Sequence, residues 1–521
     1  MTGSPDVLVV GAGPTGLALA LQAARHGASV RVVDRRGDPV RRSRAMIVHP
    51  RTLEVLRPLG VTDALLDRAD TAPGARLHLG GRVVQVRLAD LALPGTAFPH
   101  LTLVRQADVE AVLAAALREA GVAVGWGTGL GALAAGAGGV TAVLHGAVGE
   151  SRLDCGAVAG CDGADSTVRR LTGTGWPGAP YRTEAVLADV HLAGDLVAGG
   201  PAPDGATIGV GRAGLVFLFA LGEGAPWRLL ATRQVPGRPL PAGADGPPVA
   251  PAELQRLLDA AGLPARVTDV TWSARVGLQR RIARRWRTGR VFLAGDAAHV
   301  SSPAGGQGMN LGLQDAADLG WKLAQAPASS APELLLGSYQ RERRPVAAAT
   351  LALTTGLFWF EAGGHPLAGA VRGALAPRVA PVVPWLAGRQ RLVAEGVRLL
   401  GGLRTGYRGS PVCRWGSVRP AGGPHPGDRL PDAPVVRGGR PERLHALLAR
   451  PGVHVLLDRD ADPLPPAPPG ARVTVHRLDS SAGTGVLGVR PDGYTGFRSG
   501  LVDDELTDWL GVVGAGGAPP G

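Results

Sequence analysis

The chain has 521 residues, of which 45% are hydrophobic and 19% are charged. It is therefore long enough for several globular domains and too apolar for a disordered protein. The net charge of +12 does not indicate nucleic-acid binding. Lys322 is the single lysine among 55 basic residues, and such a preference for arginine is typical of the codon bias of a GC-rich genome. No zinc-finger, basic-zipper or RNA-binding pattern is present. Three cysteines without a Cys-x-x-Cys pair exclude a disulfide framework and a structural zinc site, so we expect a cytoplasmic protein without a metal.

The first predicted elements form a β-α-β unit. A strand over residues 6–10 is followed by the sequence GAGPTG, a helix over 17–26 and a second strand over 29–33 that ends at Asp34. This order places G-x-G-x-x-G at the strand-to-helix turn, where a dinucleotide-binding site requires it. The helix N-terminus offers amide donors and a positive dipole end to phosphates. Because glycines and a proline break this apolar run, we expect neither a signal peptide nor a membrane span.

The residues of this motif have separate roles. Gly11 permits the tight turn, Gly13 lets the backbone approach a pyrophosphate, and Gly16 lets helix and strand pack closely. Asp34 is placed to accept hydrogen bonds from a ribose diol. The bare glycine pattern recurs elsewhere without a strand before it and a helix after it, and we interpret those copies as turns: 173–178, 209–214 and 483–488.

Two later segments distinguish FAD from NAD as the cofactor. The first contains Asp162 and Arg169 after a strand-like stretch. The second is a strand that ends at Asp296, followed by the sequence PAGGQGMN over 303–310 and a helix over 311–323. Together with the first motif, these segments resemble in order and spacing the GxGxxG, DG and GD motifs of the class A FAD-dependent aromatic monooxygenases.

The resemblance implies a tightly, non-covalently bound FAD. In that family the GD aspartate contacts the ribityl and pyrophosphate region, and the glycine-rich loop beyond it approaches the isoalloxazine, where backbone amides can hold developing negative charge. Arg44 and Gln106 match an arginine and a glutamine that the family places near the flavin. The implied FAD contacts are Gly11, Gly13, Pro14, Gly16, Asp34, Arg35, Arg44, Gln106, Asp162, Arg169, Asp296, Gly308, Met309 and Asn310.

The C-terminal part resembles one branch of this family. The sequences PGDRLP over 426–431 and VRPDGYTGFR over 489–498 are similar to the thioredoxin-like tail of the actinomycete aromatic polyketide hydroxylases. Residues 425–521 contain no cysteine, so the role of the tail is structural and not disulfide exchange.

The expected fold class is α/β, with a Rossmann-like FAD-binding domain, an inserted antiparallel β-sheet substrate domain and a thioredoxin-like α/β tail. The FAD domain is expected to be discontinuous, over 1–175 and 286–400. Alternating β-like stretches predict the substrate sheet over 176–285, and the tail covers 401–521. The predicted substrate contacts are Phe217, Phe219 and Pro303.

The resemblance also implies the reaction. NADPH or NADH docks transiently and reduces the flavin, which reacts with O2 to give a C4a-hydroperoxide that inserts one oxygen atom into a polycyclic aromatic polyketide. We assign no catalytic base: His49 and Arg51 are the candidates on the substrate side, and His299 is interpreted as a structural histidine bonded to backbone. The predicted partners are thus an aromatic small molecule, O2 and NAD(P)H, without nucleic acid or membrane.

Several alternatives stay open. A Baeyer–Villiger oxygenation on the same scaffold and an antibiotic-inactivating hydroxylation fit the same motifs. A non-catalytic, antibiotic-binding flavoprotein is a more distant alternative. A flavin-dependent halogenase is disfavoured, because residues 358–360 (FWF) do not form its W-x-W-x-I-P motif and Lys322 is poorly placed for its lysine. The tail is compatible with a homodimer, but no residue demands one.

Overall fold

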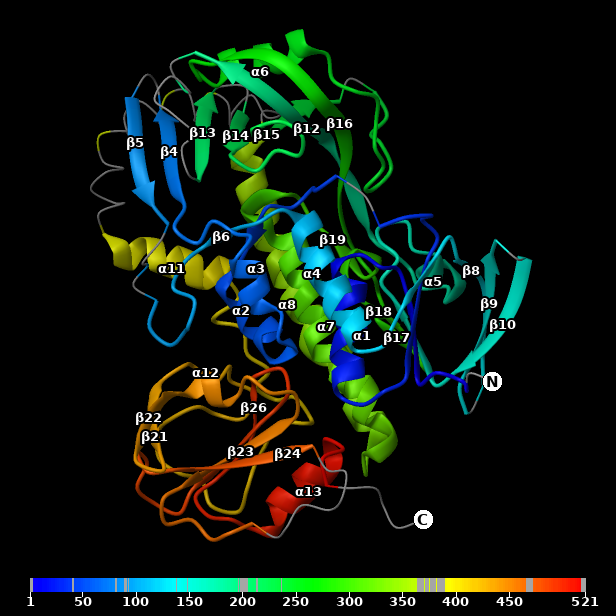
Figure 1. Cartoon of the computed structure of the whole chain (residues 1–521), viewed down its shortest axis with the longest axis vertical. Helices are drawn as coiled ribbons and strands as arrows, with labels where there is room; N and C mark the ends of the chain where they lie inside the picture. The colour runs from blue at the N-terminus through cyan, green and yellow to red at the C-terminus, as the bar shows by residue number, and fades with distance from the viewer. Residues whose placement is uncertain are drawn as a thin grey trace.

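The structure is a computed structural model of the whole chain. It describes residues 3–516 except 40–41, 80–81, 89–90, 92, 137, 148, 195, 197–204, 212–213, 236, 363–369, 371–373, 375–380, 382–388 and 465–471. Three regions are stacked along its long axis (Figure 1): a sheet covered by α6, a central α/β region and a C-terminal α/β region. No described helix combines the length and the apolar character needed to cross a bilayer.

The central region is built on a six-stranded sheet. Its order is β17 (Arg287–Thr288), β18 (Val291–Leu293), β11 (Ala157–Gly160), β1 (Val7–Val10), β2 (Val30–Asp34) and β7 (Val124–Trp126). All neighbours pair in parallel except β17 with β18. Every residue of β1 and β11 is buried, which is typical of central parallel strands covered on both faces.

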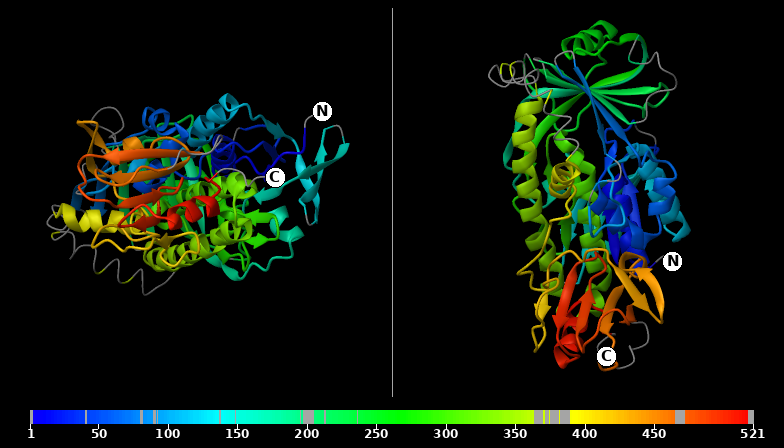
Figure 2. Two further views of the ribbon diagram at one scale, coloured as in Figure 1. Left: turned by 90° about the horizontal axis from the view of Figure 1, so that it is seen from below. Right: turned by 90° about the vertical axis from the view of Figure 1, so that its left-hand side faces the viewer.

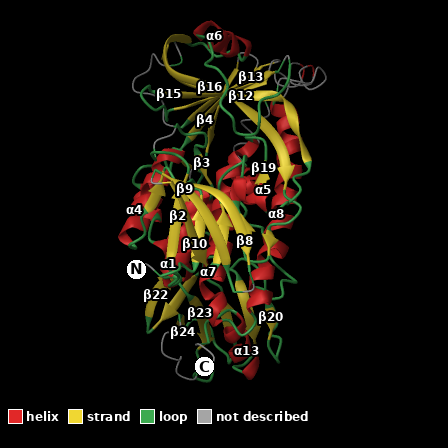
Figure 3. Cartoon of the chain, turned by 90° about the vertical axis from the view of Figure 1, so that its right-hand side faces the viewer, coloured by secondary structure: helices red, strands yellow, loops and turns green. Residues whose placement is uncertain are grey.

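Helices cover this sheet and hold its first turn. The helix α1 (Pro14–Arg25) packs against α4 (Gln106–Glu119) and α7 (Gln307–Gln325). A separate antiparallel sheet lies on the flank of the central region that faces the viewer in Figure 3. Its strands are β8 (Gly129–Ala135), β9 (Val140–Gly146) and β10 (Gly149–Cys155). The smaller elements are β3 (Ile47–Val48), α2 (Pro50–Leu56), α3 (Thr62–Leu66), β6 (Thr102–Leu103) and α5 (Thr167–Leu171).

The second region is an eight-stranded sheet. Its order is β19 (His299–Val300), β16 (Arg266–Ile282), β12 (Gly178–Ala193), β15 (Trp227–Gln234), β14 (Gly214–Phe219), β13 (Ala206–Gly211), β4 (Gly74–Leu79) and β5 (Arg82–Arg87). The helix α6 (Pro251–Ala260) covers its outer face (Figure 1). Trp227 is buried in the same apolar cluster as Leu254 and Leu258 of this helix. The sheet is larger than the sequence predicts, because β4, β5 and β19 come from outside 176–285. The parallel pairing of β13 with β4 joins the inserted strands to this N-terminal hairpin.

The C-terminal region is a mixed sheet with two short helices. The sheet order is β20 (Arg414–Trp415), β26 (Thr495–Ser499), β25 (Val486–Val489), β23 (Val453–Asp458) and β24 (Val473–Leu478). A hairpin of β21 (Pro434–Arg437) and β22 (Arg440–Arg443) leads into α12 (Leu444–Leu447), and α13 (Asp504–Val512) follows the last strand. Asp503 caps α13 by accepting from the backbone N–H of Leu506.

One long helix connects the three regions. The helix α8 (Pro332–Glu361) contacts α13 in the C-terminal region, α7 in the central region, and β14 and β16 in the eight-stranded sheet. Figure 2 shows it running lengthwise along the molecule. The helix α11 (Gln390–Leu400) follows α8 in the chain order of the described helices and packs on Leu91 and Leu93.

Candidate active site

A cavity of about 1130 Å³ lies between the central sheet and the eight-stranded sheet. Its floor is the β1–α1 turn and the end of β2, and its roof is formed by β12, β14, β15 and β16. The loop over 300–309 forms a third wall. This volume exceeds that of a typical pocket for one drug-sized ligand and is large enough for a dinucleotide together with a second molecule.

The β1–α1 turn fits a dinucleotide pyrophosphate. Gly11 has a φ of +106°, and a Cβ there would overlap the carbonyl oxygen of Cys161 and lie 2.6 Å from its carbon. A Cβ at Gly16 would collide with the carbonyl oxygen of Gly11. Only glycine is therefore accommodated at either position. The helix α1 begins at Pro14 with Gly13 as its N-cap, and both line the cavity, so the positive end of the helix dipole faces it.

Asp34 closes the same corner of the cavity. Its Oδ2 accepts a 2.7 Å hydrogen bond from the N–H of Ala12, and its Oδ1 accepts a 2.9 Å bond from the N–H of Arg36. Desolvation would raise the pKa of this carboxyl, but the hydrogen bonds from Arg36 and Ala12 outweigh it and hold the pKa below its ordinary value. Asp34 is thus an ionised acceptor on the cavity wall, beside the exposed Arg35.

Arg44 and Gln106 both line the cavity and are held by protein partners. The N–H of Arg44 lies 3.4 Å from Gln106 Oε1, and Gln106 donates to Glu110 at 2.8 Å. The Arg44 guanidinium donates to the carbonyl of Gly243 and to Asp245 Oδ1 at 2.8 and 2.7 Å. Arg44 therefore joins the central region to a loop of the eight-stranded sheet across the cavity.

The side chains of the DG motif mainly form hydrogen bonds within the protein. Asp162 lines the cavity, but its carboxylate accepts from Ser166 Oγ at 2.5 Å and from two backbone N–H groups at the start of α5, of which the nearer is Thr167 at 2.6 Å. Arg169 lies outside the cavity lining: it donates to the carbonyls of Ala164 and Ala297 at 2.7 and 2.9 Å. The structure therefore does not bring the Arg169 side chain to the predicted cofactor site, because these backbone carbonyls hold it.

The glycine-rich loop carries two kinds of residue. Asp296, Pro303, Gly308 and Met309 line the cavity. Asn310 is buried behind the loop: its Oδ1 accepts from the N–H of His49 and from Thr52 Oγ1, and its Nδ2 donates to two backbone carbonyls at 2.8 Å. Asn310 thus shapes the loop at the start of α7 and does not reach the cavity itself.

The two candidate catalytic residues do not reach the cavity. His49 is buried, its Nε2 lies 3.0 Å from the carbonyl of Gly305, and burial lowers its pKa to about 4. Arg51 is buried against the C-terminal region, where it donates to Glu54 at 3.0 Å and to the carbonyl of Asp492 at 2.5 Å. Both residues were expected on the substrate side, but their buried contacts hold them away from the cavity.

His299 is structural, with a different partner from the one expected. Its Nε2 lies 2.7 Å from Asp315 Oδ2, and the ring stacks on Trp286 with centroids 5.1 Å apart. Asp315 also accepts from the guanidinium of Arg343 and from the N–H of Gly295, so this buried group positions the GD turn. The partner is a carboxylate and not the backbone.

The roof of the cavity is apolar. Phe217 and Phe219 line it from β14 with parallel rings 6.2 Å apart. Five further residues of the roof strands and one carboxyl at the end of α8 also line the cavity and were not among the predicted site residues: Leu187, Leu230, Trp272, Val276, Leu278 and Glu361. The alternation of apolar residues along 272–278 is the signal that could have found Trp272, Val276 and Leu278. Glu361 has no such signal, because its position follows from where α8 ends.

Comparison with known proteins agrees with this geometry. Residues 4–354 match the family model described as an FAD binding domain. The 12-dehydrotetracycline 5-monooxygenase/anhydrotetracycline 6-monooxygenase of Streptomyces rimosus is 34% identical over 528 residues, which cover 97% of this chain and 99% of that protein. The chain belongs to the FAD-dependent monooxygenases. Two solved structures are similar to this FAD-dependent monooxygenase over 99% of its length. They are OxyS anhydrotetracycline hydroxylase from Streptomyces rimosus (TM-score 0.73, 29% identity, all of that chain covered) and aklavinone-11 hydroxylase with FAD and aklavinone (TM-score 0.75, 27% identity, 99% of that chain covered).

These matches confirm the predicted family, the α/β fold class and FAD as the cofactor of this monooxygenase. The individual contact residues stay predictions. The cavity brings together a large part of the predicted set: Gly11, Gly13, Pro14, Asp34, Arg35, Arg44, Gln106, Asp162, Phe217, Phe219, Asp296, Pro303, Gly308 and Met309. It leaves out Gly16, His49, Arg51, Arg169 and Asn310.

Proposed function

We propose that this monooxygenase inserts one oxygen atom from O2 into a polycyclic aromatic polyketide as a hydroxyl group, with NADPH or NADH as the transient hydride donor. The observation that carries the proposal is the shared cavity: the glycine turn and an apolar, aromatic roof line the same space. Full-length similarity to a tetracycline-type monooxygenase supports the substrate class. A flat polycycle gains most from such a roof, because aromatic faces bury large apolar areas.

The residues of the chain hold and enclose the reactants. FAD, when bound, supplies the reaction with O2 and the transfer of one oxygen atom. We assign the pyrophosphate to the Gly11–Gly13 turn and the N-terminus of α1, and the ribose to Asp34. The backbone amides at the start of α7, next to Gly308 and Met309, are positioned to stabilise negative charge at the cavity wall. The roof strands exclude water and orient the substrate.

The deciding experiment follows NADPH consumption and product mass together. Purified protein with FAD is given NADPH, O2 and a panel of polycyclic aromatics that includes anhydrotetracycline. Oxidation of NADPH that depends on substrate, with a product 16 mass units heavier, would support the proposal, and the product structure separates a hydroxyl from a Baeyer–Villiger lactone. A protein that binds FAD and a polycycle, but turns over none of the panel, would instead support the antibiotic-binding alternative.

Phe217 provides a test of the roof. The substitution Phe217→Ala removes apolar contact with the polycycle that is worth about 1.5–3 kcal/mol. We therefore expect kcat/KM for the polycycle to fall about 10- to 100-fold, mostly through a higher KM. FAD content and substrate-free NADPH oxidation should stay unchanged, because the ring lies on the roof and not at the glycine turn. Leu171→Ala, at an exposed leucine on α5, is the matched control. Unchanged kinetics in F217A would contradict placement of the substrate under β14.

Other parts of the hypothesis stay predictions. They are the preference between NADPH and NADH, a homodimer, the cytoplasmic location and the division into domains at 175, 285 and 400. A biosynthetic role and an antibiotic-inactivating role share the same chemistry, so the identity of the hydroxylated compound decides between them.

A further inference from the structure

The carboxyl of Glu361 stands at the wall of the cavity. Glu361 is the last residue of α8 and lines the space under the eight-stranded sheet. Its helix neighbours Phe358 and Ala362 are buried in an apolar cluster with residues from β12, β16 and the loop before α7: Ala185, Leu187, Val276, Leu278 and Ala304. The surroundings of this carboxyl are therefore the apolar roof beneath which we place the substrate.

Within the part of the chain that the structure describes, Glu361 has neither a hydrogen-bond nor an ion-pair partner. Burial raises its pKa from an ordinary value near 4.5 to about 7, and no charged group offsets this effect. The titratable side chains on the strands beside it have other partners. The Tyr181 hydroxyl lies 3.3 Å from Thr355 Oγ1, and Glu184 and Arg275 join the ion pairs of Arg233 and Glu253.

Other acidic groups that line the cavity have hydrogen-bond or ion-pair partners within the protein. Asp34 accepts from Ala12 and Arg36, Asp162 caps α5, and Asp245 pairs with Arg44. Asp296 also has an interaction within the protein. A carboxyl with no partner in an apolar cavity is costly unless it binds something there. The carboxyl of Glu361 is thus free to form a hydrogen bond with a substrate in the cavity.

The proposed hydroxylation has a use for such a group. An electrophilic oxygen donor reacts faster with a phenolate than with a phenol, so a base that removes the phenol proton accelerates the reaction. We propose that Glu361 is the catalytic base that accepts the proton of a phenol or enol hydroxyl on the polycyclic substrate. The substrate O–H bond breaks, a carboxyl O–H bond forms on Glu361, and the electron pair stays on the substrate oxygen. The inference rests on the proposed function and names its missing acid–base residue.

The surroundings of Glu361 suit this role. A general base is most effective when its pKa lies near the working pH, because it is then ionised before reaction and still basic enough to hold the proton. An ordinary glutamate is too weak a base for a phenol at neutral pH. The apolar roof that binds the rings is also the cause of the raised pKa of Glu361.

The test compares Glu361→Gln with Glu333→Gln, an exposed glutamate in the first turn of the same helix. The probe is anhydrotetracycline, whose visible absorbance changes on deprotonation. We expect kcat of wild type and E333Q to rise with pH through a limb near 7. In E361Q this limb should be absent, and kcat at neutral pH should fall at least about 100-fold. Wild-type protein should also bind the probe as its anion at a lower pH than E361Q does, which is a readout independent of turnover.

Stability gives a second readout. Because the folded-state pKa of Glu361 is raised, its stabilising contribution is complete below the ordinary pKa near 4.5 and is lost as pH rises through about 7. E361Q should therefore melt at the same temperature as wild type in acid and at a higher temperature above neutral pH. Equal melting curves at all pH values would mean that the carboxyl is not buried as described, and would overturn the inference.

Three further outcomes are decisive. If E361Q keeps both the pH limb and the probe spectrum, Glu361 is not the base. If its defect disappears with an analogue that lacks the dimethylamino group, Glu361 anchors a cation, and the inference is wrong. If wild type binds FAD but oxygenates no compound of the panel, the proposed function itself fails, and this result is distinct from an E361Q that matches an active wild type.

Discussion

A Gly11→Ala variant is expected to purify without the yellow colour of bound FAD. The new Cβ would overlap the carbonyl of Cys161 at the end of β11 and would lie 2.9 Å from the Cα of Asp162. Both contacts are with backbone in a buried parallel sheet, so neither side can move aside cheaply. The left-handed φ of +106° adds a strain of about 1–2 kcal/mol. We therefore expect the affinity for FAD to fall at least about 100-fold, a loss of about 2.7 kcal/mol or more.

Gly121→Ala is the matched control for this change. Gly121 also has a positive φ, +79°, but a Cβ there would meet open space. G121A therefore carries the backbone strain without the collision and should retain FAD. The ratio of flavin to protein absorbance and a fluorescence titration with FAD measure the outcome. Full flavin content in G11A would show that the turn does not need the close approach seen here.

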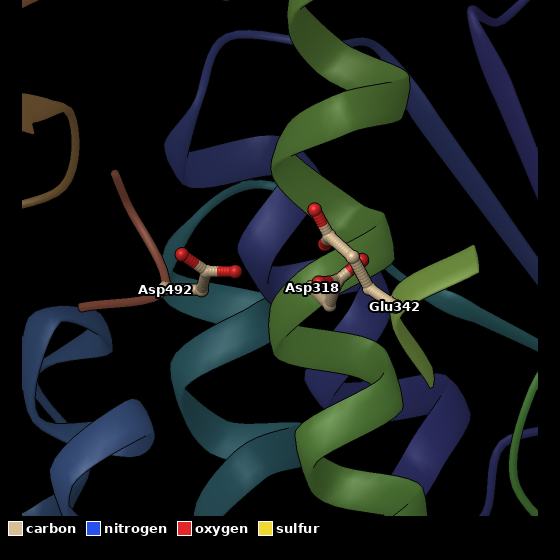
Figure 4. A group of neighbouring side chains, drawn as sticks. All are labelled: Asp318, Glu342 and Asp492. Atoms are coloured by element: carbon tan, nitrogen blue, oxygen red, sulfur yellow. The ribbon is translucent and has the colours of Figure 1, made fainter. Parts of the chain in front are cut away.

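Replacing Arg490 with methionine should destabilise the protein by about 3–5 kcal/mol, because it leaves buried carboxylates without a counter-charge. Arg490 is fully buried and donates to Glu342 at 2.7 and 2.8 Å and to Asp492 at 2.6 and 3.1 Å. Asp318 joins the same cluster, and Figure 4 shows the three carboxyl groups converging. Desolvation opposes the charge of Glu342, but Arg490 and Lys322 outweigh it and hold the pKa of this carboxyl far below its ordinary value.

The cluster joins separate parts of the chain, so its loss should loosen the C-terminal region. Asp318 and Lys322 lie on α7, Glu342 lies on α8, and Arg490 follows β25. Urea unfolding, together with limited proteolysis of the C-terminal region, measures the effect. The control is Arg437→Met, which breaks the exposed pair with Glu442 and should change stability by less than about 1 kcal/mol. Similar stabilities of R490M and R437M would show that the buried pairs do not hold the C-terminal region in place.

Local patterns were sufficient for the cofactor. The spacing of the glycines between a strand and a helix predicts the turn around Gly11 directly, although the backbone that excludes a Cβ there belongs to Cys161 and Asp162. The same holds in outline for the next motif, although β18 ends at Leu293, before Asp296, and α7 already begins at Gln307, before the predicted start at residue 311. In each case one short segment carries both the element and the role, and the structure places these residues on the cavity.

Other roles depended on packing between distant segments. Arg51 was expected on the substrate side, but a buried pair with Glu54 and a hydrogen bond to the carbonyl of Asp492 hold it against the C-terminal region. Arg169 was expected to contact the cofactor, but it braces the backbone at Ala297. Long cationic side chains reach several partners, and sequence does not say which partner the fold brings within hydrogen-bond distance.

The sequence by itself determined the family, the FAD cofactor and the order of the motifs, because each motif is a short segment with a fixed spacing of residues. The tertiary structure decided which strands form the roof, since the hairpin of β4 and β5 joins the sheet only through the pairing of β13 with β4. It also decided where the substrate-facing carboxyl stands. Glu361 lies at the roof because α8 extends from the C-terminal region to the eight-stranded sheet, and its raised pKa comes from the apolar neighbours that this placement brings together.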